Sequence, residues 1–251
     1  MKLDDVKKLH QKKYRAKFGY YLVEGEHLVL ELAKATHIRN DLNDISIYIS
    51  EEHESWAHKL NMRNTQANIQ VLSAKQMTQL SDTKSPQGIV ARLPLPKPQD
   101  LHQQPAAHRN VYLHEIQDPG NLGTILRSLA WFGDFTLLLS KNCVDPFNPK
   151  VVRASMGAIF HVPIELELEL EDLTTRFKRF AYLDMRGSEI SSSDFAKYEC
   201  YLFGNEARGV PTQALTNLNA DAFTINGAGA IDSLNLASAV NICAYQLSLS
   251  N

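Results

Sequence analysis

The sequence predicts an α/β protein in two parts, because of its length, its alternation of strands and helices, and one proline-rich joint. Its 251 residues suffice for one large domain or two modest ones with a buried core. Apolar residues make up 44% and charged residues 22%, which excludes collagen-like, low-complexity and wholly disordered chains. Four prolines between Leu93 and Asn110 favour an extended connector. We therefore expect domains at 1–93 and 110–251, joined by a linker at 94–109.

The first part alternates short apolar strands with amphipathic helices. Apolar spacing predicts a helix over 22–35, and strict alternation predicts a half-buried strand over 45–49. The other elements expected here are helices over 54–60 and 74–80 and strands over 69–72 and 88–91. This order predicts a small α/β layer sandwich.

The second part repeats this alternation and closes with a long, mostly apolar helix over 234–249. Its short, continuously apolar strands predict a parallel sheet covered on both faces. We expect strands over 111–113, 136–139, 160–164, 180–183, 199–203 and 222–225. Helical patterns between them cover 122–132, 151–157, 170–177 and 211–218. The alternating glutamates from Glu165 to Glu171 indicate a solvated edge or loop.

Neither a membrane span nor a secretory signal is evident in the sequence. No stretch approaches the ~18 consecutive apolar residues of a span, and the first residues lack an apolar core. Cys143, Cys200 and Cys243 lie far apart among apolar residues, which is typical of reduced, buried thiols. We therefore expect a cytoplasmic protein. The nine histidines lack metal-ligand spacing, so we expect no metal and interpret His114 and His161 as structural.

The charge is unevenly distributed, although the net charge is only −2. Residues 1–20 contain seven Lys or Arg and two Asp, whereas the rest of the chain is acidic. A basic arm of this kind can bind phosphates locally, and a solvated helix face is the alternative.

The first candidate motif runs from Asp118 to Arg127, after a strand and into a helix. Asn121 is a suitable N-cap for this helix and Gly133 a suitable end. Gly123 and Arg127 share a helix face, which leaves room for a ligand beside the guanidinium. Because an arginine fork bonds two oxygens at once, Arg127 suits a phosphate. An ordinary surface arginine is the alternative.

Two further motifs lie in turns after predicted strands. Residues 202–210 form a polar turn between glycines, where Glu206 is either an acid, base or amine-binding carboxylate or an ordinary exposed one. Residues 225–235 form a glycine loop before the last helix, which Ser233 can cap. The loop lacks the third glycine of a dinucleotide fingerprint because Asp232 stands there, which argues against a nicotinamide site.

Taken together, these segments resemble the three ordered motifs of the SpoU/TrmH family of RNA 2′-O-ribose methyltransferases, in the SPOUT superfamily. The matching patterns are Asn121-x-Gly-x-x-x-Arg127, Gly204-Asn-Glu-x-x-Gly209 and Ser233-Leu-Asn235, with a further similarity over 152–158. The segments 15–25 and 86–89 resemble the L30e-like substrate-binding domain often attached to that family. The chain departs from the family at Asn226-Gly227, where Pro-Met is usual.

The resemblance implies a SPOUT-type α/β knot with a mostly parallel sheet, in which the C-terminal chain threads a loop to form a trefoil knot. It also implies S-adenosyl-L-methionine as the cofactor. The positions matched to cofactor binding are Gly204, Ile225 and Leu234, flanked by Leu202 and Gly229.

The resemblance assigns Arg127 to activation of a ribose 2′-hydroxyl together with an RNA phosphate. A guanidinium stays protonated in proteins and is not ordinarily a base. We therefore expect Arg127 to clamp the phosphate, while that phosphate, Glu206 or water accepts the proton. Asn121, Glu206, Ser233 and Asn235 match the other active-site positions.

The family resemblance further implies a homodimer and a first domain that binds folded RNA. The candidate RNA contacts are Lys12, Lys13, Arg15 and Lys17, besides Arg127. We expect ribosomal RNA of the 23S type as the substrate, because the extra domain accompanies ribosomal substrates more often. A tRNA 2′-O-methyltransferase and a non-catalytic RNA-binding or ribosome-assembly protein are the alternatives.

Overall fold

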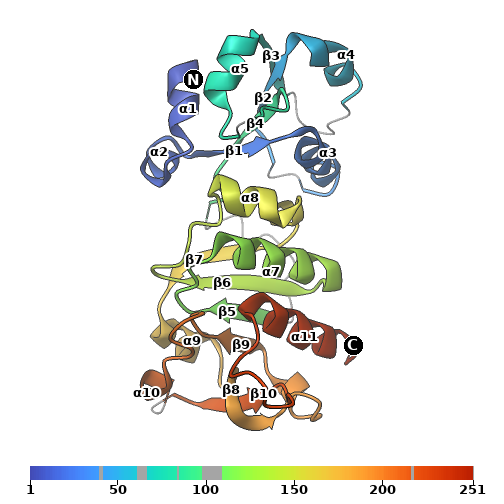
Figure 1. Ribbon diagram of the computed structural model, residues 1–251. Coiled ribbons are helices and arrows are strands. Elements are labelled where there is room, and N and C mark those ends of the chain that lie inside the picture. Colours follow the sequence, from blue (N-terminus) through green and yellow to red (C-terminus); the bar gives the residue numbers. More distant parts are fainter. Residues whose placement is uncertain (40–41, 61–66, 84, 98–108, 216–217, 251) are drawn as a thin grey trace. The chain divides into compact units, whose positions relative to one another are not determined.

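The protein is described by a computed structural model covering residues 1–251 except 40–41, 61–66, 84, 98–108, 216–217 and 251. The chain forms two compact units (Figure 1). The first unit contains Met1–Asp100 and Asp145–His161, and the second contains Leu101–Val144 and Val162–Asn251. The segment 145–161, which we expected in the second domain, therefore packs with the first unit. Most of the expected linker lies outside the described residues.

The first unit is built on a four-stranded mixed sheet in the order β1-β4-β2-β3. The β1/β4 and β2/β4 pairs are antiparallel, and β2/β3 is parallel. The strands are β1 (Tyr20–Glu24), β2 (Ser46–Ser50), β3 (Asn68–Leu72) and β4 (Ile89–Pro94). The helices are α1 (Leu3–Lys8), α2 (Lys12–Phe18), α3 (Glu26–Ala35), η1 (Glu51–His53), α4 (Glu54–Ala57), α5 (Ala74–Leu80), α8 (Pro149–Ser155) and η2 (Ala158–Phe160).

The helix expected over 22–35 is shorter than predicted, because its first residues belong to strand β1. Aromatic and β-branched residues such as Tyr21 and Val23 favour a strand, and both are buried there. Gly25 then adopts φ 107°, which glycine tolerates and a helix does not. The helical spacing is thus correct only from Glu26 onward.

Arg15 is a buried structural residue of α2, with 3% of its surface exposed. Its Nε and one terminal nitrogen donate to the Asp145 carboxylate at 3.0 and 2.5 Å. The other terminal nitrogen donates to the carbonyls of Leu9 and His10, both at 2.8 Å. A guanidinium enclosed in this way cannot reach an RNA backbone, so the expected RNA contact at Arg15 is corrected.

The second unit is a six-stranded sheet in the order β10-β8-β9-β5-β6-β7, and every neighbouring pair is parallel. This arrangement confirms the predicted parallel α/β fold. The strands are β5 (Arg109–Leu113), β6 (Phe135–Ser140), β7 (Ile164–Leu168), β8 (Phe180–Glu189), β9 (Cys200–Phe203) and β10 (Ala220–Thr224). The helices are α7 (Pro119–Phe132), α9 (Leu170–Arg176), η3 (Phe195–Lys197), α10 (Thr212–Leu215) and α11 (Leu236–Ser248).

Three local predictions for the second part need correction. The strand expected over 160–164 overlaps β7 only at Ile164, because Ala158–Phe160 form η2; β7 is an edge strand in which Glu167 is exposed and Glu165 is half-buried. Helix α7 is capped by Asp118, not Asn121, because Pro119 already occupies its first position. Helix α11 is capped by Asn235 and not by Ser233.

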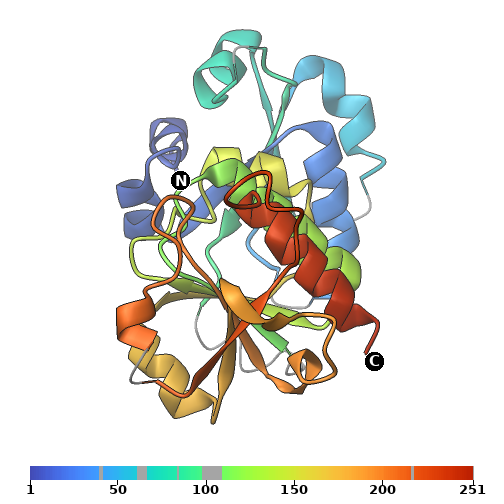
Figure 2. The same ribbon diagram turned by 60° about the horizontal axis from the view of Figure 1, so that its bottom comes forward.

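Helices α7 and α11 run side by side in the second unit (Figures 1 and 2). Apolar side chains from neighbouring strands, among them Tyr112, Leu138 and Leu202, form a core against α9 and α10. Cys200 and Cys243 are buried and Cys143 is half-buried, all three as free thiols, and burial raises the pKa of each. In the described part of the chain, no helix is long and apolar enough to cross a membrane. The trefoil knot stays a prediction.

Replacement of Arg15 by methionine tests its structural role. Arg15→Met should lower the free energy of unfolding by about 2–4 kcal/mol, because it leaves a largely buried carboxylate without its partner. Urea denaturation followed by circular dichroism measures this loss. Lys17→Met, at an exposed position of the same helix, should change stability by less than about 0.5 kcal/mol. Equal effects of the two substitutions would contradict the buried role of Arg15.

Candidate active site

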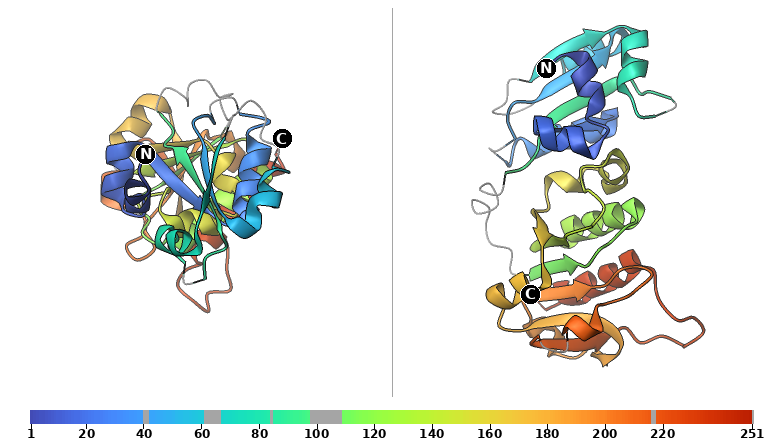
Figure 3. Two further views of the ribbon diagram at one scale, coloured as in Figure 1. Left: turned by 90° about the horizontal axis from the view of Figure 1, so that it is seen from above. Right: turned by 90° about the vertical axis from the view of Figure 1, so that its left-hand side faces the viewer.

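The second unit brings three loop segments together at the edge of its sheet where the parallel strands have their carboxyl ends. Residues 114–121 follow β5 and enter α7, residues 204–209 follow β9, and residues 225–235 connect β10 to α11. Strands β5 and β9 are parallel neighbours, so the segments that follow them emerge at the same edge. The course of the third segment can be followed in Figure 3.

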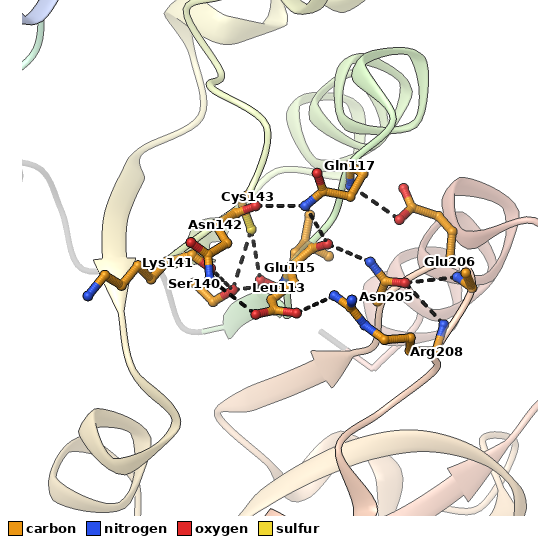
Figure 4. A network of polar contacts seen from close by, with 11 residues as sticks. Leu113, Glu115, Gln117, Ser140, Lys141, Asn142, Cys143, Asn205, Glu206 and Arg208 are labelled. Carbon is orange, nitrogen blue, oxygen red and sulfur yellow. Dashed lines mark hydrogen bonds and ion pairs between the residues drawn. The ribbon is translucent and has the colours of Figure 1, made fainter. Parts of the chain in front are cut away.

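Glu206 joins the second polar segment to the first. Its two carboxylate oxygens accept hydrogen bonds from the main-chain N–H groups of Gln117, at 3.2 Å, and Asp118, at 3.1 Å. The side-chain amide of Asn121 donates to the same carboxylate at 3.3 Å. Figure 4 shows Glu206 facing the Gln117 main chain. The exposed Glu206 carboxylate thus holds the residues at the start of α7 in place.

Asn121 continues this chain of contacts to the third segment. Its side-chain oxygen accepts a hydrogen bond of 2.9 Å from the Asn235 amide. The Asn235 oxygen in turn accepts from the main-chain N–H groups of Ala237 and Ser238, which fixes its orientation as the cap of α11. The structure therefore brings together Asn121, Glu206, which lies 85 positions after it, and Asn235, which lies 114 positions after it.

Asn205 shapes the turn that carries Glu206. It is 7% exposed, and its side-chain oxygen accepts the N–H groups of Ala207 and Arg208 at 2.9 and 3.0 Å. Its amide donates to the Glu115 carbonyl at 2.7 Å. Its main chain also exchanges two hydrogen bonds with Gly209, which closes the turn. Asn205 was not among the predicted site residues, although an asparagine inside a glycine-bounded turn is typical of a residue that braces the turn.

A second set of polar contacts holds the segment after β5 (Figure 4). Glu115 forms an ion pair with Arg208, and its main-chain N–H donates to the Ser140 hydroxyl at 2.7 Å. The Gln117 amide donates to the carbonyls of Glu115 and Asn142 at 3.1 and 2.7 Å. None of these residues was among the predicted site residues. Their positions at or just after the carboxyl ends of β5, β6 and β9 are the signal that points to them, because ligands bind at that edge.

A cavity of about 600 Å³ lies along the third segment, lined by residues 183–185, 223–234 and Ala239. The expected cofactor residues Ile225, Gly229 and Leu234 and the expected site residue Ser233 belong to this lining. Apolar side chains at its rim are unusually open to solvent, with exposed fractions of 74% for Met185, 74% for Ile231 and 46% for Leu234. Exposed apolar groups around a cavity are typical of a ligand site.

Other predicted site residues lie elsewhere in the second unit. Leu202 is fully buried in the core, and Gly204 packs against the main chain of Gly209, so neither lines the cavity. Arg127 is exposed on α7, and no described residue forms a hydrogen bond or ion pair with its guanidinium. Its planar fork is therefore available to an external anion.

His114 directly follows β5, and His161 belongs to the first unit. Burial lowers the pKa of both His114 and His161 below its usual value, which keeps their imidazoles neutral near pH 7. Within the described ranges, no group of three or more His, Cys, Asp or Glu side chains could hold a metal ion.

Comparison with known proteins agrees with this geometry. Residues 108–245 match the SpoU rRNA Methylase family, and residues 2–91 match the MRM3-like substrate binding domain. An uncharacterized tRNA/rRNA methyltransferase of Synechocystis is 30% identical over 96% of this chain and 88% of its own length. The 23S rRNA (guanosine(2553)-2′-O)-methyltransferase RlmP of Bacillus subtilis is 28% identical over 98% of this chain and 95% of its own. The AdoMet-bound crystal structure of an rRNA methyltransferase from Sinorhizobium meliloti is 26% identical with a TM-score of 0.80, and the match covers 99% of this chain and 94% of that one.

The parallel sheet and the polar edge beside a cavity define an α/β protein with a candidate ligand site at the carboxyl ends of its strands. The chain belongs to the SpoU rRNA methylase family. The resemblance found in the three sequence motifs is thereby confirmed.

Replacement of Gly204 by alanine tests how closely the Glu206 turn is packed. A Cβ atom at Gly204 would lie 2.1 Å from the Gly209 carbonyl carbon, so the turn must shift. Gly204→Ala should lower the free energy of unfolding by about 1–3 kcal/mol and release Glu206 from α7. Urea denaturation measures the first effect, and faster hydrogen exchange at the Gln117 and Asp118 amides measures the second.

The matched control is Gly209→Ala, where a Cβ meets no atom within 4 Å but φ is +69°. This substitution should cost stability through backbone strain alone, about 1–2 kcal/mol, and leave those two amides protected. Equal protection of the amides in both variants would contradict the packing argument.

Proposed function

We propose that the protein transfers a methyl group from S-adenosyl-L-methionine to a ribose 2′-hydroxyl of RNA, with ribosomal RNA as the substrate. The observation that carries this proposal is the contact chain Glu206–Asn121–Asn235, which ends directly beside the 600 Å³ cavity. It unites the three segments that resemble the family's motifs.

The cavity suits the proposed cofactor. Met185, Ile225 and Leu234 offer apolar surface for an adenine ring, and the small residues 227–230 let main-chain groups approach a ligand closely. The structure of the Sinorhizobium relative contains AdoMet, which supports the same ligand here. When bound, the cofactor supplies an electrophilic sulfonium methyl group.

The protein's own residues align the RNA for that reaction. Arg127 binds a phosphate through two N–H groups and so fixes the adjoining ribose, which matters because a sugar hydroxyl is a weak nucleophile at neutral pH. Glu206 already accepts three hydrogen bonds, so we assign it to ordering Asn121 rather than to proton transfer. The hydroxyl proton passes to the bound phosphate or to water. Ser233 supplies a polar group at the cavity wall, and Asn235 holds the end of the loop next to it through Asn121.

Ribosomal RNA is favoured over transfer RNA by the relatives. RlmP is a 23S rRNA methyltransferase, and the substrate-binding domain match is described as MRM3-like. The Synechocystis relative is described for both RNA classes, so a tRNA substrate is the second candidate. Location in the cytoplasm stays a prediction.

Helix α2 offers a surface for RNA in the first unit. Lys12, Lys13 and Lys17 are all exposed on this helix. The Lys13 ammonium lies 4.8 Å from the ring centre of Tyr14, and that of Lys17 lies 5.5 Å from the ring centre of Phe18. We propose that these ammonium groups bind RNA phosphates without regard to sequence.

A second copy of the chain is the partner that we propose for α7 and α11. Trp131 is 85% exposed, and Tyr245 and Leu249 are 54% and 62% exposed. The rings of Phe132 and Tyr245 lie 6.0 Å apart, which connects the apolar surfaces of the two helices. A patch of this kind is typical of a protein–protein interface.

Replacement of Arg127 by lysine tests the phosphate clamp and the reaction together. With ribosomal RNA and S-adenosylmethionine, the native protein should introduce a ribose methyl group that mass spectrometry maps to one nucleotide. Arg127→Lys should lower kcat about 100-fold while RNA affinity stays within about threefold, because an ammonium cannot hold two oxygens in one plane.

Arg176→Lys is the matched control, since Arg176 is an exposed arginine of α9 paired with Glu165. It should retain full turnover. Near-native turnover of Arg127→Lys would refute the clamp, and absence of any ribose methylation by the native protein on ribosomal or transfer RNA would refute the function.

Removal of the α2 lysines tests the RNA surface. The triple variant Lys12→Ala, Lys13→Ala, Lys17→Ala should weaken binding to RNAs of different sequence alike. The slope of log Kd against log salt concentration should fall by about 2–3, because up to three phosphate contacts are lost. Filter binding across a salt series measures the slope. A control that removes Lys34, Lys59 and Lys75 should retain the native slope, and an unchanged slope in the α2 variant would exclude this surface.

A further inference from the structure

The loop that forms much of the cavity wall has little structure of its own. Residues 226–235 are all exposed, and Gly229 adopts φ +74° with no atom near its Cβ position. Among the described residues, none from 227 to 234 makes a hydrogen bond, so the shape of this stretch depends on how its two ends are held. The C-terminal end is held by Asn235 through its contact with Asn121.

The N-terminal end of the loop is held by Glu189, the last residue of β8. The Asn226 amide donates to one carboxylate oxygen of Glu189 at 2.5 Å. The Ser191 hydroxyl donates to the other oxygen at 2.9 Å, so both carboxylate oxygens are engaged. The main chain beside this contact is also held in place, because the Ile190 N–H donates to the Thr224 carbonyl at 3.0 Å between the ends of β8 and β10.

We infer that Glu189 and Asn226 are positioning residues that set the cofactor loop for S-adenosylmethionine. Asn226 directly follows Ile225, which lines the cavity, and precedes the unsupported stretch. When this end is fixed, the free loop is already close to its cofactor-bound conformation, so cofactor binding costs less conformational entropy of the loop. When this end is free, the contacts between loop and cofactor must also order the eight residues 227–234. The inference rests on the proposal that the cavity holds the cofactor.

Calorimetric titration of the full chain with S-adenosylmethionine tests this role without any RNA. Asn226→Ala and Glu189→Ala should each raise Kd about fivefold, the expected effect of losing one hydrogen bond to a charged group at a solvent-exposed position. The double variant should be no worse than either single variant, since both remove the same contact. Hydrogen exchange at residues 227–234 should be faster in each variant.

A reversal of donor and acceptor separates this contact from a general structural effect. Asn226→Asp alone should bind more weakly than Asn226→Ala, because two carboxylates then face each other. Adding Glu189→Gln to Asn226→Asp should restore affinity toward the native value, since the Gln amide can donate to the new carboxylate. Asn219→Ala is the control, because the Asn219 amide donates to the Lys178 carbonyl at 2.8 Å outside the cavity lining, and it should bind normally.

The outcomes distinguish this inference from the proposed site. Ile225→Asp should abolish binding if the cavity holds the cofactor. Native affinity in Asn226→Ala and Glu189→Ala together with loss in Ile225→Asp would overturn the positioning role and leave the cavity assignment intact. Native affinity in all three variants would overturn both.

Discussion

The candidate site depends on the hydrogen bonds that the Glu206 carboxylate accepts. It lies in a turn after β9, yet all three of its hydrogen-bond donors come from the segment that leads from β5 into α7. The Asn121 side chain also accepts a hydrogen bond from Asn235, which caps α11. A single exposed carboxylate therefore links a turn, the start of one helix and the start of another. Because the donors are partly main-chain groups, the position of Glu206 is fixed by the fold and not by one partner side chain.

The parallel sheet explains why these segments meet. Strands β5, β6 and β9 are adjacent in the sheet, so the segments following them share one edge although residues in contact there are up to 93 positions apart along the chain. The buried Asn205 and the more exposed Glu115–Arg208 ion pair hold that edge together. The cavity lies beside it, along a loop whose residues 226–235 are exposed. A hydrogen-bonded polar edge next to an apolar cavity wall suits a reaction in which one substrate must be aligned and another enclosed.

Arg15 and Arg127 differ in what their guanidinium groups can bind, because Arg15 is buried and Arg127 is exposed. Arg15 and Arg127 both lie on helices in segments that the sequence marks as phosphate contacts. Arg15 uses its donors on Asp145 and two carbonyls, whereas no described residue pairs with Arg127. Only the second guanidinium is available to RNA. The same distinction separates Leu202, which is sealed in the core, from Ile225 and Leu234 at the cavity.

The sequence by itself determined the parallel α/β class, the order of the motifs and the family, because apolar periodicity and short motifs are local properties. It also grouped Asn121, Glu206 and Asn235 in one candidate site, and the structure places the three side chains in one chain of hydrogen bonds. Only the tertiary structure decided how they touch, that β1 ends the expected helix early, and that the segment 145–161 packs with the first unit. Burial and hydrogen-bond partners depend on residues distant in the chain, and the apolar periodicity of one segment does not reveal those distant contacts.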